Sequence, residues 1–185
     1  MTESNFVTLH VHTEQGGFDG FGSVHDFVRT AAERGDPAFA CSEHGTLRGI
    51  HDLDRACKEF QIHPVFGIEF YLADDMNQHG LEAGALEEIQ GGGGTARERK
   101  EAVYQEEVRR GLRDRAHLTV FAADQEGLHN LFRLSSESWT RGFYHRPRID
   151  LDFLEAHSGG LIVLSGCVQG LIAQERLEVP AEFEK

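Results

Sequence analysis

Two histidines two residues apart, His10 and His12, are the first side chains whose spacing could do chemistry. They end the run Phe6–His12, whose β-branched and aromatic residues are typical of a strand. Since the side chains of a strand alternate between its faces, both imidazoles would lie on one face, about 6.6 Å apart along the strand. At that spacing they could hold one metal between them or begin a site with several metals. The alternative is that one histidine faces a barrel interior or solvent by chance.

Further side chains that could bind a metal lie in the glycine loop after this first strand, or in or just after later predicted strands. They comprise two carboxylates, an imidazole and a thiol: Asp19, Glu69, His44 and Cys167. Each has a structural alternative, respectively a turn residue, a buried ion-pair partner, a helix cap and a small buried side chain. In parallel α/β barrels, however, functional residues gather at the C-terminal ends of the strands. At one rim, this mixture of donors would suit zinc, manganese or iron.

His117 does not follow this rule, because it precedes its predicted strand, Leu118–Ala122. A parallel strand would place it at the opposite end of the barrel. Either the strand begins earlier than its apolar residues indicate, or the barrel is distorted there. The other seven histidines fall on predicted helices and loops and are expected at the surface: His25, His51, His63, His79, His129, His145 and His157.

The elements that must position these side chains alternate regularly at the start of the chain. After the first strand, the expected elements are a helix over Val24–Arg34, a strand over Pro37–Cys41, a helix over Ile50–Phe60 and a strand over Val65–Leu72. This β-α-β-α-β order favours a parallel sheet with helices packed outside it. A helix face over 128–135 and a buried strand over 161–164 follow later.

Residues 74–116 interrupt the alternation. They contain four consecutive glycines, Gly91–Gly94, followed by the highly charged stretch Ala96–Arg115. This composition predicts an insertion with a flexible glycine joint and a solvated helix.

Composition restricts the class of protein. The chain has 185 residues, which suits one domain or the front of a larger one, and 39% hydrophobic residues, which indicates a globular protein. Three well-separated cysteines and no stretch of ~20 apolar residues or signal peptide favour a reducing, cytoplasmic protein without a membrane span. The net charge of −13 argues against a broad nucleic-acid groove, although metals could hold a phosphate in a local pocket.

A local basic stretch contrasts with this acidic surface. It surrounds Gly142–Tyr144 and comprises Arg141, His145, Arg146 and Arg148. It could be a solvated loop, or it could contact phosphate or a neighbouring domain. The glycines near Asp19 do not have the G-x-G-x-x-G order of dinucleotide-binding loops, and no nucleophile elbow is present.

Several segments in order carry a family resemblance: "FVTLHVHTE", "FDG", "SEHGTLRGI", "PVFGIEFYLA", "HLTVFA", "NLFRLSS", "GFYHRPRID" and "EAHSGGLIVLSGC". Together they closely resemble the PHP (polymerase and histidinol phosphatase) domain at the N-terminus of the alpha subunit of bacterial DNA polymerase III, a C-family replicative polymerase. The resemblance covers nearly the whole chain outside the insertion. The stretch from His117 to Cys167 is similar to the replicative polymerase branch rather than to histidinol phosphatase.

The resemblance implies a distorted seven-stranded (βα) barrel over residues 1–185 that binds up to three divalent metals. It also implies a metal-dependent phosphoesterase, in some members a 3′–5′ proofreading exonuclease acting in DNA replication. The expected partners are the 3′ end of a primer strand, polymerase domains in cis and replisome subunits. By motif, the metal ligands fall on His10, His12, Asp19, His44, Glu69, His117 and Cys167.

The chain departs from the family pattern at two places. Glu43 stands where the family usually has Asp before the histidine, and we expect it behind the metals, orienting His44. The family's last two ligands, an Asp-x-His pair, have no counterpart after Cys167. We therefore expect the barrel to lack its last strand or strands. Two alternatives to an exonuclease stay open: a catalytically silent structural or interaction module of the polymerase, and a free-standing PHP phosphatase.

Overall fold

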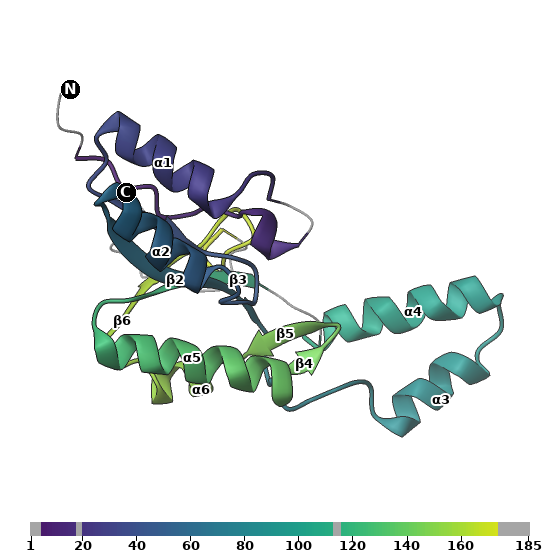
Figure 1. Cartoon of the computed structure of the whole chain (residues 1–185). Helices are drawn as coiled ribbons and strands as arrows, with labels where there is room; N and C mark the ends of the chain where they lie inside the picture. The colour runs from purple at the N-terminus through teal and green to yellow at the C-terminus, as the bar shows by residue number, and fades with distance from the viewer. Residues whose placement is uncertain (1–4, 18–19, 113–115, 174–185) are drawn as a thin grey trace, which may run out of the picture.

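The computed structural model describes residues 5–17, 20–112 and 116–173, which form a mixed α/β fold around one long strand (Figure 1). This strand is β2 (His63–Leu72). On it, β1 (Ala38–Cys41) pairs in parallel with the first residues, and β5 (Arg146–Ile149) pairs in parallel with the last two. β3 (Ala116–Ala122) runs antiparallel to β2. The buried C-terminal half of β2, which contains Glu69, is thereby flanked by strands of both directions.

Two further strands extend the sheet. β6 (Leu161–Leu164) pairs antiparallel with β3, and the short β4 (Phe143–Tyr144) pairs antiparallel with β5. The order along the main path is β4-β5-β2-β3-β6, with β1 attached to β2. Gly67 permits the close packing of β2 on β3, because a Cβ at this position would collide with the ring of Phe121.

Two helices cover β1. α1 (Val24–Arg34) begins after Ser23, whose hydroxyl accepts from the backbone N–H of Asp26, and ends at Gly35 with a left-handed φ of 83°. α2 (Ile50–Phe60) packs beside α1. Their apolar faces bury one core cluster: Val24, Val28, Ala31, Phe39, Cys41, Leu53, Ala56 and Cys57. The predicted bounds of both helices are confirmed.

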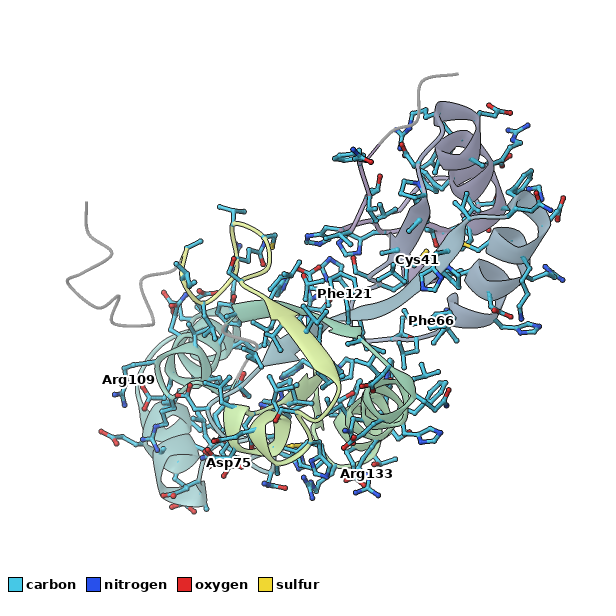
Figure 2. All side chains as sticks on the ribbon, turned by 90° about the vertical axis from the view of Figure 1, so that its left-hand side faces the viewer. Cys41, Phe66, Asp75, Arg109, Phe121 and Arg133 are labelled. Atoms are coloured by element: carbon cyan, nitrogen blue, oxygen red, sulfur yellow. The ribbon has the colours of Figure 1, made fainter. Side chains whose placement is uncertain are left out.

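A second core lies under α5 (Gln125–Thr140) and α6 (Leu151–Ala156), which pack on the rest of the sheet. It joins residues of β2, β3, β5 and these helices: Ile68, Phe70, Leu72, Ala116, Leu118, Val120, Leu131, Leu134, Ile149 and Leu154. Figure 2 shows Cys41 and Phe66 in the part with α1 and α2, Arg133 in the part with α5, and Phe121 between them. β2 therefore runs through both cores.

The expected insertion is a pair of helices. α3 (Ala83–Gly91) and α4 (Ala96–Arg109) pack on each other and extend away from the sheet (Figure 1). A capping box between Thr95 and Glu98 starts α4. The sequence suggested only one helix here. The last residues of that predicted helix, 113–115, lie outside the described residues, and Ala116 already belongs to β3.

Two expectations about the sheet need correction. The predicted first strand, Phe6–His12, is an extended segment with a single bridge, from Thr8 to Phe39. The sheet is mixed rather than parallel, because β3 and β6 reverse direction. The described ranges contain six strands, a mixed α/β arrangement that is compatible with the expected barrel, and the seventh strand and the closure of the barrel stay predictions. No helix in these ranges is long and apolar enough to cross a membrane.

Candidate metal centre

Glu69 lies at the middle of a cluster of imidazoles. It belongs to β2, and its side chain is fully buried. Four imidazole nitrogens lie 3.0–3.3 Å from its carboxylate oxygens: Nε2 of His10, Nε2 of His12, Nδ1 of His44 and Nδ1 of His117. These histidines come from three separate stretches of the chain, so tertiary structure assembles the cluster.

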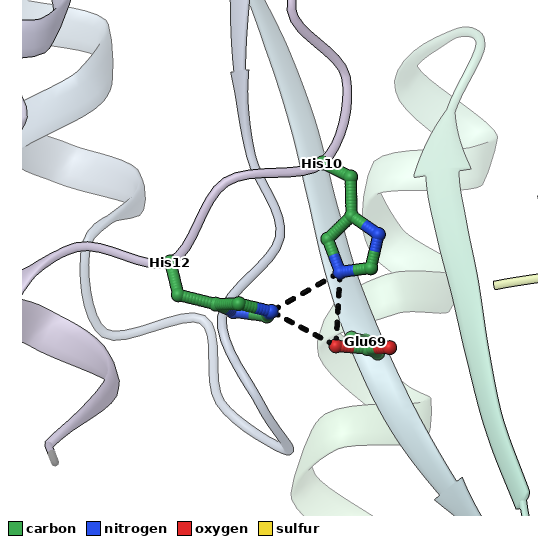
Figure 3. A group of neighbouring side chains, drawn as sticks. All are labelled: His10, His12 and Glu69. Atoms are coloured by element: carbon green, nitrogen blue, oxygen red, sulfur yellow. Dashed lines mark hydrogen bonds and ion pairs between the residues drawn. The ribbon is translucent and has the colours of Figure 1, made fainter. Parts of the chain in front are cut away.

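The extended segment before η1 (Glu14–Gly16) carries His10 and His12. Its backbone follows β1: Ala40 N–H donates to the carbonyl of Thr8, and Ser42 N–H donates to that of Val11, each at 3.1 Å. Both imidazoles consequently reach the same oxygen of Glu69, as Figure 3 shows. The one-face prediction for this histidine pair is confirmed, although the segment is not a regular strand.

His44 follows the end of β1 and forms a parallel bridge with Glu69. Two backbone hydrogen bonds fix this bridge: Gly45 N–H donates to the carbonyl of Glu69 at 2.8 Å, and Glu69 N–H donates to that of Glu43 at 3.0 Å. Gly45 adopts a φ of +61°, a left-handed conformation that glycine takes at little cost. The chain can therefore turn away directly after placing the imidazole of His44.

His117 reaches the cluster because β3 is antiparallel to β2. It is the second residue of β3 and lies opposite Tyr71, while Thr119 lies opposite Glu69. Directly opposed residues of an antiparallel pair share a face, and Tyr71 and Glu69 share a face because they are two residues apart. The start of β3 therefore meets the end of β2, and the strand-end rule failed because it assumed a parallel strand.

The charge of Glu69 is fixed by its neighbours. Burial opposes its ionisation, but hydrogen bonds from His117, His12 and His44 outweigh burial and hold the pKa of its carboxyl well below the usual range. Glu69 is thus an anion at neutral pH. A single carboxylate facing four imidazoles is a suitable set of donors for a cation.

The donors form two groups that share Glu69, and in each group the ligand atoms lie within 4.8 Å of one another. One group is His10, His12 and Glu69; the other is His44, Glu69 and His117. Ligand atoms around one tetrahedral zinc lie about 3.3 Å apart for bonds of about 2.0–2.1 Å, and Nε2 of His10 lies 3.1 Å from Nε2 of His12. The spacing and the N/O chemistry both fit divalent zinc, manganese or iron.

A cavity of about 660 Å³ opens beside this cluster and shares His44 and His117 with it. Its walls carry basic and aromatic side chains from separate elements: Arg48, Tyr71, Trp139, Phe143, His145 and Arg146. Tyr71 stacks on His44 with ring centroids 5.6 Å apart and contacts His117 edge-on at 5.0 Å. The cluster is therefore connected directly to a pocket that could admit a ligand.

Comparison with known proteins identifies the family of the chain. The PHP domain family matches residues 8–184 of the chain. That span is nearly the whole sequence. The chain belongs to the PHP domain family.

Several curated relatives of this PHP domain bear the name DNA polymerase III subunit alpha. The protein of that name from Chlamydia muridarum is 36% identical over 180 residues, 97% of this chain. Those from Chlamydia trachomatis and Aquifex aeolicus are 34% and 32% identical over 97% and 90% of the chain. The chain spans only 12–13% of the length of these relatives.

The two remaining expected metal ligands of the PHP domain are Cys167 and Asp19, and only the first lies among the described residues. The sulfur of Cys167 lies 3.6 Å from Nδ1 of His117, beside the second group but outside both. Its thiol has a raised pKa, chiefly because of burial and also because of Glu69. Asp19 lies outside the described residues, so its role stays a prediction.

Glu43 contacts the segment that carries the first two histidines. It accepts a hydrogen bond from the backbone N–H of Thr13 at 2.9 Å and another from its hydroxyl, and it lies 4.0 Å from Nδ1 of His12. These contacts place Glu43 against the segment that carries His10 and His12. Its orientation of His44 stays a prediction.

The basic stretch of the PHP domain divides into two kinds of residue. Arg148 is fully buried and donates to the backbone carbonyls of Gly142, Leu112 and Gln78, so it is a structural residue rather than a solvated one. Arg146, in contrast, lines the cavity. The sequence singled out Arg146 but missed Tyr71 and Trp139. Tyr71 was detectable, because it is two residues from Glu69 on the same strand.

Proposed function

We propose that this PHP domain is a metal-dependent phosphoesterase of a replicative polymerase alpha subunit, and that it removes nucleotides from DNA 3′ ends during proofreading. The observation that carries the proposal is Glu69, a buried carboxylate shared by two groups of imidazoles beside an open cavity. Two neighbouring metals are a recurrent arrangement for phosphodiester hydrolysis. The names of the relatives support the polymerase context.

The roles of the side chains follow from their positions. His10, His12 and Glu69 would hold one metal, and His44, Glu69 and His117 another, with Asp19 and Cys167 as further proposed ligands of up to three metals. When bound, divalent metals supply Lewis acids for the phosphate oxygens and lower the pKa of a water. Arg48 and Arg146 line the adjoining cavity and would attract the phosphate chain there.

The charge of the chain limits how much of this binding the domain performs itself. With −13 overall, its surface repels duplex DNA away from the pocket. We therefore propose that polymerase domains in cis hold the primer and present only its 3′ end, in a cytoplasmic replication complex with other subunits.

The test measures metal content and 3′ exonuclease activity in the full-length protein that carries this domain. With manganese or zinc, the wild type should shorten a primer from its 3′ end. His12→Ala should lose bound metal and at least about 100-fold in rate, since second-shell changes alone cost 10–100-fold. His25→Ala is the matched control, because His25 lies on α1 and is half exposed. A metal-loaded wild type without hydrolysis contradicts the proposal.

A second candidate function, a structural module, rests on a specific observation. The cluster joins the segment before η1, the end of β1, β2 and the start of β3, so bound metals would also brace the fold. If chelation lowers the melting temperature while no nuclease activity is found before or after, this function replaces the first. Hydrolysis of phosphate monoesters without action on DNA would instead favour a free-standing phosphatase.

A further inference from the structure

Two aromatic rings form a wall of the cavity and remain open to solvent. Trp139, in the last turn of α5, is 49% exposed, and Phe143, at the start of β4, is 46% exposed. Their rings are stacked, with centroids 5.5 Å apart and planes inclined by 21°. Nε1 of Trp139 donates to the carbonyl of Gly45 at 2.7 Å. The indole is therefore fixed next to His44, although burial alone would not hold it there.

A cationic side chain is fixed on the same cavity. Arg146 donates from Nη1 to the hydroxyl of Tyr71 at 2.6 Å, and its guanidinium carbon lies 4.7 Å from the centroid of that ring. Tyr71 is 95% buried and stacks on His44. The positive charge of Arg146 is consequently one ring away from the proposed metal ligands.

We propose that this cavity is a nucleotide subsite, in which Trp139 and Phe143 receive the terminal base and Arg146 receives a phosphate. The proposal rests on the proposed function, whose substrate it specifies as a 3′-terminal nucleotide that carries a base and is unpaired. Aromatic rings stack on any base, since every base has a π-face, whereas a guanidinium recognises phosphate irrespective of sequence. The subsite therefore selects for the presence of a base and not for its identity.

Selection for an unpaired end follows from the same contacts. A base in a duplex is stacked on its neighbours, and it must leave the stack before a protein ring can cover it. A mismatched or frayed terminal base leaves at a lower free-energy cost than a paired one. The subsite would thus favour the ends that proofreading must remove, without reading the mismatch itself.

The composition of the chain provides a direct probe, because Trp139 is its only tryptophan. We expect thymidine 5′-monophosphate, added to the 185-residue chain in EDTA and again with zinc, to quench the tryptophan fluorescence. Deoxyribose 5-phosphate, which lacks a base, should not quench it, and thymidine, which lacks a phosphate, should bind more weakly. Circular dichroism in both buffers checks that the fold is intact.

Single variants test the aromatic wall and the cationic side chain of the subsite separately. Phe143→Ala should raise the Kd for thymidine 5′-monophosphate about tenfold, the size of a lost base–aromatic stack. Arg146→Gln should make the nucleotide bind no better than thymidine. Phe132→Leu and Arg133→Gln are matched controls on α5 outside the cavity lining, and they should leave both titrations unchanged.

Activity of the full-length protein gives the second measurement. Wild type should prefer a single-stranded 3′ end with a terminal base over one with a terminal abasic residue by about tenfold in KM. Trp139→Ala combined with Phe143→Ala should remove that preference.

Three outcomes would overturn the subsite: equal quenching by the nucleotide and by deoxyribose 5-phosphate, no quenching at all, or an unchanged preference in the double variant. The two rings would then be a contact for another protein domain. Quenching by nucleotide in a protein that hydrolyses no DNA would uphold the subsite and contradict the exonuclease.

Discussion

Glu69 belongs to both groups of proposed ligands, whereas each histidine belongs to one. This asymmetry predicts different losses of metal. Glu69→Gln keeps the size of the side chain but removes its negative charge, so we expect both metals to be lost. His10→Ala should lose one metal and retain the other. Metal analysis of the purified variants measures the stoichiometry.

The control for this comparison is Glu59→Gln, which alters an exposed carboxylate on α2 paired with His25. Its metal content should equal that of the wild type. If Glu69→Gln keeps one metal while His10→Ala keeps none, then Glu69 does not bridge the two groups, and the assignment of ligands is wrong.

The three cysteines should react very differently with a thiol reagent. Burial raises the pKa of the Cys57 thiol to about 11 and raises that of Cys41 further. At pH 8 a raised pKa means less thiolate, the reactive form, so both should stay unmodified in the folded chain. Cys167 is partly exposed and should react, more slowly than a free cysteine because its pKa is raised too.

Zinc should protect Cys167 if its sulfur is a ligand, since a coordinated thiolate is not available to the reagent. Counting modified thiols against time, with and without zinc, measures this. One thiol is expected to react without zinc, none with it, and all three after denaturation. Labelling of Cys167 at the same rate with zinc would exclude it from the ligands.

The helices α1 and α2 were predicted closely from the sequence, because their ends and buried faces depend on local signals. Ser23 and Gly35 mark the ends of α1, and its apolar spacing identifies the buried face. Strand direction is not local. The sequence near His117 does not specify that β3 runs antiparallel to β2, so its place in the cluster followed only from the family resemblance and from the structure.

The sequence predicted which residues form the candidate site, but not how those residues are arranged in space. His10, His12, His44 and Glu69 were identified from their types and from their places beside predicted strands. Trp139 in the cavity wall was not, because only the packing of α5 against the sheet brings it beside the cluster. From sequence alone, an aromatic residue on a helix or strand is assigned to the core. Only the tertiary structure shows which of these residues are exposed.

Arg148 joins β5 to both ends of the helical pair α3–α4. It is fully buried, and it donates to the carbonyls of Gln78 before α3 and Leu112 after α4. Arg148→Met should lower the free energy of unfolding by about 3 kcal/mol, since several buried carbonyls lose their donor at roughly 1–3 kcal/mol each. The urea midpoint measures the change.

Arg133→Met is the matched control, because Arg133 is exposed on α5 and should change stability by no more than about 0.5 kcal/mol. An Arg148→Met protein as stable as the wild type would show that the carbonyls find other donors. Under that outcome the α3–α4 pair would be attached to the sheet mainly by other contacts.

The fold as a whole has two cores joined by β2, and the proposed metal ligands lie along this connection. The first core depends on α1, α2 and β1, while the second depends on α5, α6 and the remaining strands. His44 follows β1 of the first core, and His117 belongs to β3 of the second. Metals that bind these residues would therefore stabilise the contact between the cores as well as the site.

Removing metal should accordingly lower the melting temperature of the domain. A ligand present at 1,000 times its Kd stabilises the folded state by about 4 kcal/mol, and for a chain of this size each kcal/mol corresponds to roughly 2–4 °C. We expect EDTA to lower the melting temperature of the wild type by about 10 °C. Glu69→Gln, which should bind no metal, provides the internal control, because EDTA should leave its melting temperature unchanged. If EDTA lowers both melting temperatures equally, the stabilising metal binds away from Glu69; if it lowers neither, the two cores are held together by packing alone.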